Sequence, residues 1–115
     1  MSSNVRELGS RTGPWSLATA DLSGVSPRVL DDGEWIASEL ERVLSVCLGA
    51  VEWRTHRFAP RGLSLVGTAL RGRVIVHTWP ERGALTIDLY GELDEIGPAL
   101  DAGVTSVLRG MREAV

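Results

Sequence analysis

Residues 63–90 read LSLVGTALRGRVIVHTWPERGALTIDLY, and this stretch decides the fold. Its runs of β-branched and other apolar residues predict three strands, at 63–70, 73–79 and 84–90. Gly72 separates the first two runs, and residues 80–83 (Pro-Glu-Arg-Gly) separate the second two. Connections this short join antiparallel neighbours, so the stretch predicts a three-stranded antiparallel unit.

Two more strands and two helices are predicted outside this unit. The strand candidates are residues 15–22 and 50–58. Asp31, with Glu34 three residues later, resembles a capping box that opens a helix, and Gly49 ends it. The apolar stripe of this helix consists of Ile36, Leu40, Val43, Leu44 and Cys47. A second helix begins near residues 94–98 and runs to the end, with a stripe of Ile96, Leu100, Val104, Leu108 and Met111.

These patterns predict one α+β domain, a two-layer sandwich with two helices on one face of an antiparallel sheet. In residues 84–90 the apolar and polar side chains alternate, so one sheet face meets the helices and the other carries Thr86, Asp88 and Tyr90. We expect a dimer interface or a ligand site on that second face. Residues 1–14 are polar and rich in Gly and Ser, which predicts a flexible N-terminal arm before a domain over 15–115.

Composition and charge exclude several classes of function. The net charge is −3 without a basic stripe, which argues against nucleic acid, and no apolar run reaches the ~18 residues of a membrane span. We therefore expect a cytoplasmic protein. All 12 basic residues are arginine, which is typical of a high-GC bacterium and excludes a lysine Schiff base. Cys47 is the only cysteine, so it forms no intramolecular disulfide and is interpreted as a core side chain.

Three blocks in the second half of the chain resemble the short prokaryotic type of S-adenosylmethionine decarboxylase. The blocks are His56-Arg57-Phe58 with Pro60, Gly62, Leu63 and Ser64; His77-Thr78-Trp79-Pro80-Glu81 with Gly83; and Ile87-Asp88-Leu89-Tyr90. The resemblance implies a four-stranded antiparallel sheet with helices on one face, and a homodimer with sites at the subunit boundary. Typical members continue into another strand after the second helix, and no strand is predicted there in this sequence.

The resemblance also exposes two replaced residues. Family members make a pyruvoyl group from the serine of a Glu-Ser-His triplet, and the matching triplet here is Arg71-Gly72-Arg73. Glycine has no hydroxyl to attack the preceding carbonyl and no leaving group to eliminate. The proton-donating cysteine of the family falls at Glu92 or Gly91. We therefore expect no pyruvoyl group, no self-cleavage and no cofactor.

The resemblance assigns roles to several residues, each with a structural alternative. Phe58 and Trp79 match the residues that sandwich adenine, or they are core aromatics; Glu81 matches a ribose-binding residue, or it is a solvated turn residue. His77 matches the histidine that assists processing, and here it is either a repurposed acid/base or a structural hydrogen-bonding residue. Ser64 matches a site serine, which needs His77 within reach to act as a nucleophile.

The remaining candidates are charged. Glu92 is a second candidate acid/base, while Arg71 and Arg73 are either anion ligands or solvated hairpin residues. His56 is interpreted as a strand surface residue. Two histidines and one cysteine give no metal-ligand spacing, so no metal site is expected.

The leading hypothesis is a cofactor-free enzyme that acts on S-adenosylmethionine or another small molecule in specialised biosynthesis. Its chemistry would be that of a lyase, cyclase or hydrolase. The alternative is a catalytically inactive homologue that binds and regulates an active decarboxylase in polyamine synthesis.

Overall fold

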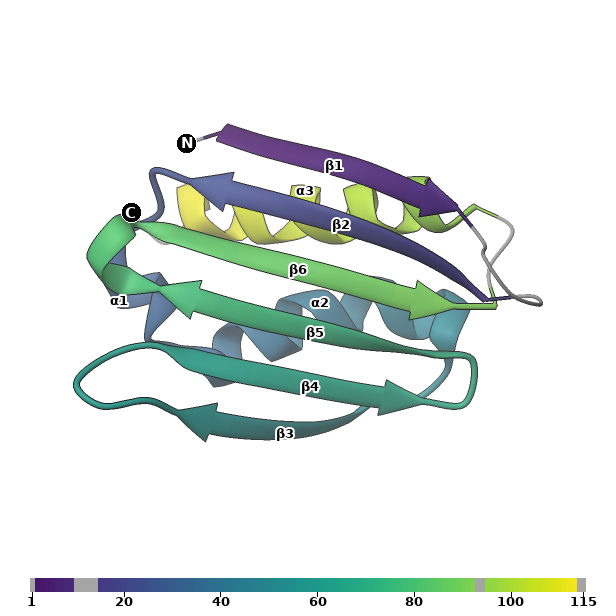
Figure 1. Ribbon diagram of the computed structural model, residues 1–115, viewed down its shortest axis with the longest axis horizontal. Coiled ribbons are helices and arrows are strands. Elements are labelled where there is room, and N and C mark those ends of the chain that lie inside the picture. Colours follow the sequence, from purple (N-terminus) through teal and green to yellow (C-terminus); the bar gives the residue numbers. More distant parts are fainter. Residues whose placement is uncertain (1, 10–14, 93–94, 114–115) are drawn as a thin grey trace.

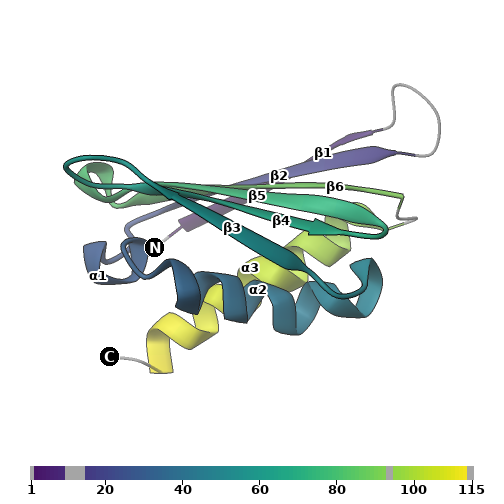
Figure 2. The ribbon, with the colours of Figure 1, turned by 90° about the horizontal axis from the view of Figure 1, so that it is seen from below.

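A computed structural model describes residues 2–9, 15–92 and 95–113. In it, one antiparallel sheet is covered on a single face by the helices (Figures 1 and 2). The elements are β1 (Ser2–Gly9), β2 (Ser16–Ser23), α1 (Pro27–Leu30), α2 (Gly33–Leu48), β3 (Glu52–Arg57), β4 (Leu63–Ala69), β5 (Gly72–Trp79), the 3₁₀ turn η1 (Pro80–Arg82), β6 (Ala84–Gly91) and α3 (Ile96–Glu113). The six strands lie in the order β1-β2-β6-β5-β4-β3. The predicted α+β sandwich is confirmed, with six strands where the sequence patterns predicted five and the resemblance implied four, and with α1 as a short additional helix.

The prediction of a flexible arm was wrong for Ser2–Gly9, which forms the edge strand β1. β1 pairs with β2 from Ser2↔Ser23 to Gly9↔Leu17. A polar segment can serve as an edge strand because its backbone hydrogen bonds need only one partner and one face is solvated. Among the side chains of β1 that the structure describes, Val5 is half-buried and packs against the core. β1 therefore occupies the outer edge of the sheet; residues 10–14 lie outside the described residues.

The first long helix starts one residue later than the predicted capping box. Asp32 is the N-cap of α2, and its carboxylate accepts a hydrogen bond of 3.1 Å from the backbone N–H of Trp35. Asp31 instead ends the short helix α1, where its N–H donates to the carbonyl of Pro27. Gly49 ends α2 as predicted, with a φ of 90° that favours glycine.

The core lies between the sheet and the helices. Alternate strand residues point into it and are fully buried, namely Ala18, Ala20, Leu65, Val74, Val76, Leu85, Ile87 and Leu89. Helix residues Ile36, Leu40, Leu44, Leu48, Ile96, Leu100, Val104 and Val107 meet them. Cys47 packs beside this core as predicted: its Sγ donates to the Leu44 carbonyl, and burial raises the pKa of the thiol.

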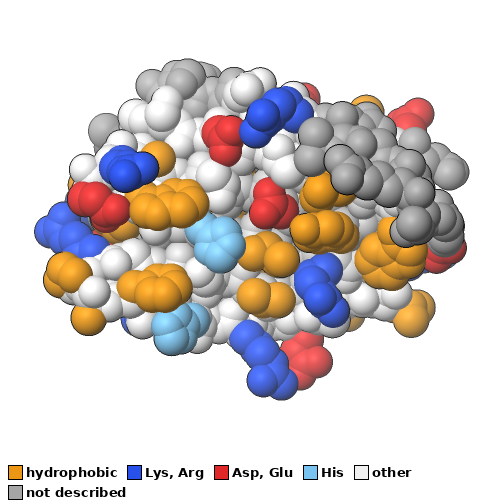
Figure 3. Space-filling model, viewed as in Figure 1, with side chains coloured by type: hydrophobic (Ala, Val, Ile, Leu, Met, Phe, Trp, Pro, Cys, Tyr) orange, Lys and Arg blue, Asp and Glu red, His pale blue; other side chains and the backbone are white. Residues whose placement is uncertain are grey.

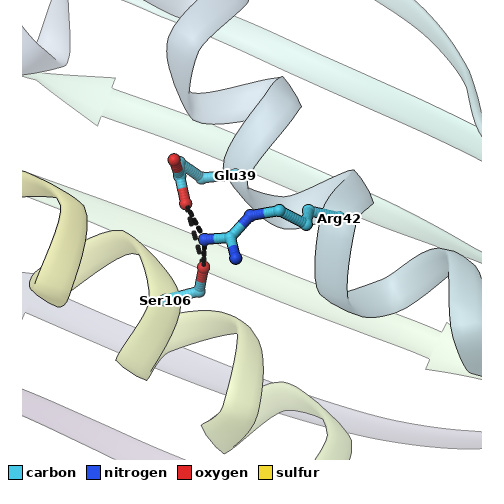
Figure 4. Close-up of polar contacts among 3 residues, drawn as sticks. All are labelled: Glu39, Arg42 and Ser106. Carbon is cyan, nitrogen blue, oxygen red and sulfur yellow. Dashed lines mark hydrogen bonds and ion pairs between the residues drawn. The ribbon is translucent and has the colours of Figure 1, made fainter.

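A polar cluster joins the two long helices (Figure 4). Arg42 donates to the carboxylate of Glu39 at 2.7 Å and to the hydroxyl of Ser106 at 2.9 Å. Ser106, which is buried on α3, donates in turn to the same Glu39 oxygen at 2.9 Å. The hydrogen bond from Arg42 is the main cause that lowers the pKa of Glu39. These contacts hold α2 against α3. Both helices lie on one face of the sheet, and no helix of the described residues covers the opposite face (Figure 2).

Among the described residues, no helix is long and apolar enough to cross a membrane.

Candidate functional site

The open face of the sheet carries side chains from every strand. In Figure 3, which views this face, pale-blue histidines lie among orange hydrophobic side chains on the left, and blue and orange side chains gather on the right. Antiparallel register sets the order of the side chains across the sheet. His77 on β5 lies opposite Ser64 on β4 and Thr86 on β6, and Asp21 on β2 lies opposite Thr86.

Ser64 and His77 form a direct pair. Their cross-strand register brings the Ser64 Oγ within 2.6 Å of the His77 Nδ1, and both residues are half-buried. When Nδ1 is unprotonated, the hydroxyl donates to it, which is the arrangement of a nucleophile and its base. For Ser64 to act as a nucleophile, His77 must lie within hydrogen-bond reach. The structure meets this condition.

Five of the predicted site residues line one hollow of about 280 Å³. The hollow is lined by Phe58, Arg61, Leu63, Ser64, His77, Thr78, Trp79 and Glu81. Phe58 and Trp79 are 51% and 37% exposed, so neither is the buried core aromatic that the alternative required. We call this group, Phe58, Ser64, His77, Trp79 and Glu81, the aromatic end of the sheet.

Two hydrogen bonds fix the turn before β4, which positions Phe58 at the aromatic end. The N–H of Phe58 donates to the carbonyl of Gly62 at 2.9 Å, and the N–H of Leu63 donates to the buried Thr78 hydroxyl at 3.0 Å. Gly62 has a φ of 97°, which favours glycine, and a Cβ there would lie 3.0 Å from the Thr78 carbonyl oxygen. His56 is exposed, as predicted, and its ring lies edge-on to Phe58 with centroids 4.6 Å apart.

Asp88 is a feature of this face that sequence reasoning did not single out as a site residue. It is half-buried in the middle of the sheet, opposite Thr19 on one side and Ile75 on the other. Burial raises the pKa of its carboxyl, and the positive charge of His77 partly offsets this effect. The buried hydroxyl of Thr19 makes no hydrogen bond within the described residues. Two sequence features could have identified Asp88 as a site residue: it lies on the polar side of the alternating residues 84–90, and it belongs to the third block that resembles the family.

The other predicted residues lie at the opposite end of β5. We call Arg71, Gly72, Arg73 and Glu92 the hairpin end. Gly72 and His77 share β5, and at about 3.3 Å per residue their Cα atoms are roughly 17 Å apart. Glu92 is exposed, and its N–H donates to the Arg71 carbonyl at 3.1 Å. The structure therefore brings Ser64 and His77 together but leaves Glu92 at a distance within one chain.

Gly72 is packed against backbone. It pairs with Gly91, and a Cβ at position 72 would lie 2.2 Å from the Tyr90 carbonyl oxygen and 2.8 Å from a methyl of Leu48. Real Cβ atoms essentially never approach so closely, so β5 and β6 would have to separate to admit any side chain here.

Two further hollows border the same face. One, of about 360 Å³, is lined by Trp15, Arg73, Ile75 and Tyr90 at the hairpin end. The other, of about 380 Å³, lies on the β1 side of Trp79 and includes Asn4, Asp21, Ser23, Arg82 and Thr86. Across the described ranges 2–9, 15–92 and 95–113, no cluster of His, Cys, Asp or Glu is arranged to hold a metal ion.

An antiparallel sheet with helices on one face and with a serine, a histidine and two aromatics on the other defines a small α+β protein whose open face carries the candidate site. Comparison with known proteins identifies the family. The S-adenosylmethionine decarboxylase family model matches residues 16–101, and the chain belongs to this family. The match begins at β2, so β1 lies outside it.

Individual relatives agree. The chain is 32% identical over 81 residues to the S-adenosylmethionine decarboxylase proenzyme of Caldanaerobacter subterraneus, a match that spans 69% of this chain and 64% of the relative. It is 31% identical over 72 residues to the proenzyme of Methanococcus vannielii, spanning 61% and 58%. The crystal structure of the adenosylmethionine decarboxylase from Aquifex aeolicus superimposes with a TM-score of 0.65 at 29% identity, covering 81% of this chain and 78% of that one. The matched region is thus less than two thirds of the length of these two proenzymes.

Proposed function

We propose that this protein binds S-adenosylmethionine, or a related adenosyl compound, at the aromatic end and acts on it without a pyruvoyl group. The observation that carries the proposal is the single hollow in which Phe58, Trp79, Glu81 and the Ser64–His77 pair come together. Three of these residues match family positions for the nucleoside, and all three are exposed to a ligand.

Each side chain suits a part of the ligand. Phe58 and Trp79 both line the hollow and offer aromatic faces on which a planar base can stack, which is worth about 1–3 kcal/mol per base. The Glu81 carboxylate is an acceptor for the two ribose hydroxyls. A sulfonium next to an aromatic face gains roughly 0.5–2 kcal/mol more.

The residues at the hairpin end do not fit a pyruvoyl group. The group is made from a serine of the chain itself, and position 72 holds glycine, in a space that admits no Cβ. The available chemistry is therefore that of the Ser64–His77 pair, with His77 as the base that accepts the Ser64 proton or as an acid toward the ligand. Such groups suit proton transfer, elimination, cyclisation or hydrolysis.

A homodimer is part of this proposal. Glu92, the second candidate acid/base, is too far from His77 to act with it on one small ligand within a single chain. Two subunits packed through the open face can bring the hairpin end of one to the aromatic end of the other. The exposed aromatics Trp15, Phe58, Trp79 and Tyr90 support burial of this face, because wide apolar patches are unusual on monomers.

Titration calorimetry with S-adenosylmethionine tests the ligand. We expect a saturable signal that Trp79→Ala abolishes and Glu81→Gln weakens, while Glu52→Gln, an exposed glutamate outside the hollow, leaves it unchanged. Mass analysis of the ligand after incubation separates the two hypotheses: turnover indicates an enzyme, and tight binding without turnover indicates a regulatory homologue. No binding of any adenosyl compound would refute the proposal.

Light scattering tests the assembly. At tens of micromolar the protein should have twice the 12.4 kDa mass of one chain. A monomer at that concentration would contradict the dimer and would leave Glu92 without a role at the aromatic end.

A further inference from the structure

Arg61 lines the same hollow as Phe58, Trp79 and Glu81, but the proposed function gives it no role. It lies in the turn between β3 and β4, next to Gly62, and it falls outside the blocks by which the chain resembles its family. Its side chain is exposed and, within the described residues, makes no hydrogen bond or ion pair, although the Glu81 carboxylate lines the same hollow. The hollow therefore offers a guanidinium that can bind a group of the ligand.

The other parts of an adenosyl ligand leave one group for Arg61. In the proposed function the base stacks on Phe58 and Trp79, and the two ribose hydroxyls bind Glu81. The remaining substituent of an adenosyl compound is attached to the 5′ carbon of the ribose, so this substituent meets the rest of the lining. Among the residues that line the hollow, Arg61 is the one with a permanent positive charge.

We propose that Arg61 makes this hollow selective for adenosyl compounds whose 5′ substituent carries an anionic group, either a carboxylate or a phosphate. This selectivity rests on the proposed function, and it specifies the class of ligand. The planar guanidinium presents paired donors that match two oxygens of either group. S-adenosylmethionine meets the requirement through the carboxylate of its amino-acid part, whereas the same compound without that carboxylate does not.

A guanidinium on this carboxylate also affects which reaction is possible. If the carboxylate leaves as CO₂, the negative charge that Arg61 binds is lost from that group as the reaction proceeds. An interaction that is stronger in the ground state than in the transition state raises the barrier. Arg61 therefore favours chemistry elsewhere on the ligand, in agreement with the glycine at position 72.

Titration calorimetry with a matched pair of ligands tests Arg61 in the whole protein. S-adenosylmethionine and decarboxylated S-adenosylmethionine differ only in the carboxylate, and S-adenosylmethionine should bind at least about tenfold more tightly. Arg61→Gln should remove this difference. Adenosine 5′-phosphate, compared with adenosine, measures the same preference for a phosphate. The anion whose binding Arg61→Gln weakens more identifies the ligand as an amino-acid conjugate or as a nucleotide.

Arg82→Gln is the matched control. It removes the same charge from an exposed arginine near Trp79, but Arg82 lines the hollow on the β1 side of Trp79 and not the hollow that contains Arg61. The preference for the anionic ligands should therefore persist in this variant.

Three results would overturn the proposed selectivity while adenosyl binding stands. The first is equal affinity of the wild-type protein for the ligands with and without the anion, and the second is a preference that survives in Arg61→Gln. The third is a dimeric wild type with a monomeric Arg61→Gln variant in light scattering, because Arg61 then binds a carboxylate of the second copy. If no adenosyl compound binds the wild type, the proposed function fails, and the selectivity fails with it.

Discussion

The two ends of strand β5 differ in what lies beside them. At the aromatic end, Phe58, Trp79 and Glu81 line an open hollow. At the hairpin end, Gly72 has no side chain, and the Tyr90 carbonyl oxygen fills the space that a side chain would need. One end presents side chains around a hollow, and the other brings two strands into close backbone contact at a glycine.

This difference predicts that substitutions at the two ends have different consequences. A residue on the open face contacts solvent or ligand, so it can be kept or replaced with little effect on the core. Gly72 is buried between two strands, and its replacement is tied to the spacing of β5 and β6. Three variants test whether the two ends differ in their roles in activity and stability. They are given from the largest expected effect to the smallest.

His77→Ala should have the largest effect, at the aromatic end. If His77 is the base for Ser64, its loss slows consumption of S-adenosylmethionine by about 10²–10⁴-fold, the usual contribution of general acid–base catalysis. The measurement is ligand turnover followed by mass. Circular dichroism must show an intact fold, and His56→Ala, which removes the only other histidine, should change turnover far less. A folded His77→Ala protein with normal turnover would move the chemistry away from the aromatic end.

Gly72→Ser should have the next largest effect, at the hairpin end. The added Cβ overlaps the Tyr90 carbonyl oxygen, so we expect destabilisation at or above the upper end of the overpacking range, about 3 kcal/mol. Urea unfolding measures it. Mass spectrometry should show one uncleaved chain of about 12.4 kDa. The strands must separate to admit the new side chain, so its hydroxyl is not held in place to attack the preceding carbonyl.

Gly67→Ala is the matched control for Gly72→Ser. Its Cβ meets side-chain atoms of Val51, Trp53 and Val74 at 2.7–2.9 Å, and side chains adjust more readily than backbone. It should therefore cost less than Gly72→Ser. A stable Gly72→Ser protein that cleaves itself would show that the hairpin end has kept the processing geometry.

Asp88→Asn should have the smallest effect, between the two ends. Since the folded-state pKa of Asp88 is raised, the folded protein holds this proton more tightly than the unfolded chain does. Its contribution to stability is thus complete below the ordinary value of 3.8 and is lost as the pH rises through the raised pKa. Asparagine avoids this loss, so the variant should be more stable than wild type at pH 7, by less than about 1 kcal/mol. Thermal unfolding across pH should show the advantage shrinking toward pH 3; an advantage that is constant with pH would contradict the assignment to Asp88.

The fold followed from local patterns, and its departures from prediction have physical causes. Alternation in residues 84–90 identified the buried face correctly because the side-chain period of a strand is two. β1 was missed because an edge strand needs few apolar residues. The cap was placed at Asp31 instead of Asp32 because both can accept the hydrogen bond, and only the path of the chain after α1 decides between them.

The sequence predicted which residues make up the site but not how they are arranged in space. Sequence blocks named Phe58, Ser64, His77, Trp79 and Glu81, which line one hollow. Sequence could not show that Glu92 lies near Arg71 and far from His77, since that depends on the register of β6 against β5. Nor could it show the crowding at Gly72, which arises from the pairing with Gly91 and from Leu48 of a distant helix.

The pairing of β2 with β6 has a consequence for how the chain reaches its folded state. Ala20 lies opposite Ile87, so the first third of the chain finds its place only against a strand from the last third. During synthesis, β1 and β2 leave the ribosome long before β6 exists, and their small buried residues have nothing to pack against. Proteins dominated by such distant pairings fold in milliseconds to seconds, whereas helical bundles fold in microseconds to milliseconds. Completion of β6 is therefore the event that joins β1 and β2 to β5, β4 and β3, and the continuous open face of six strands exists only from that moment.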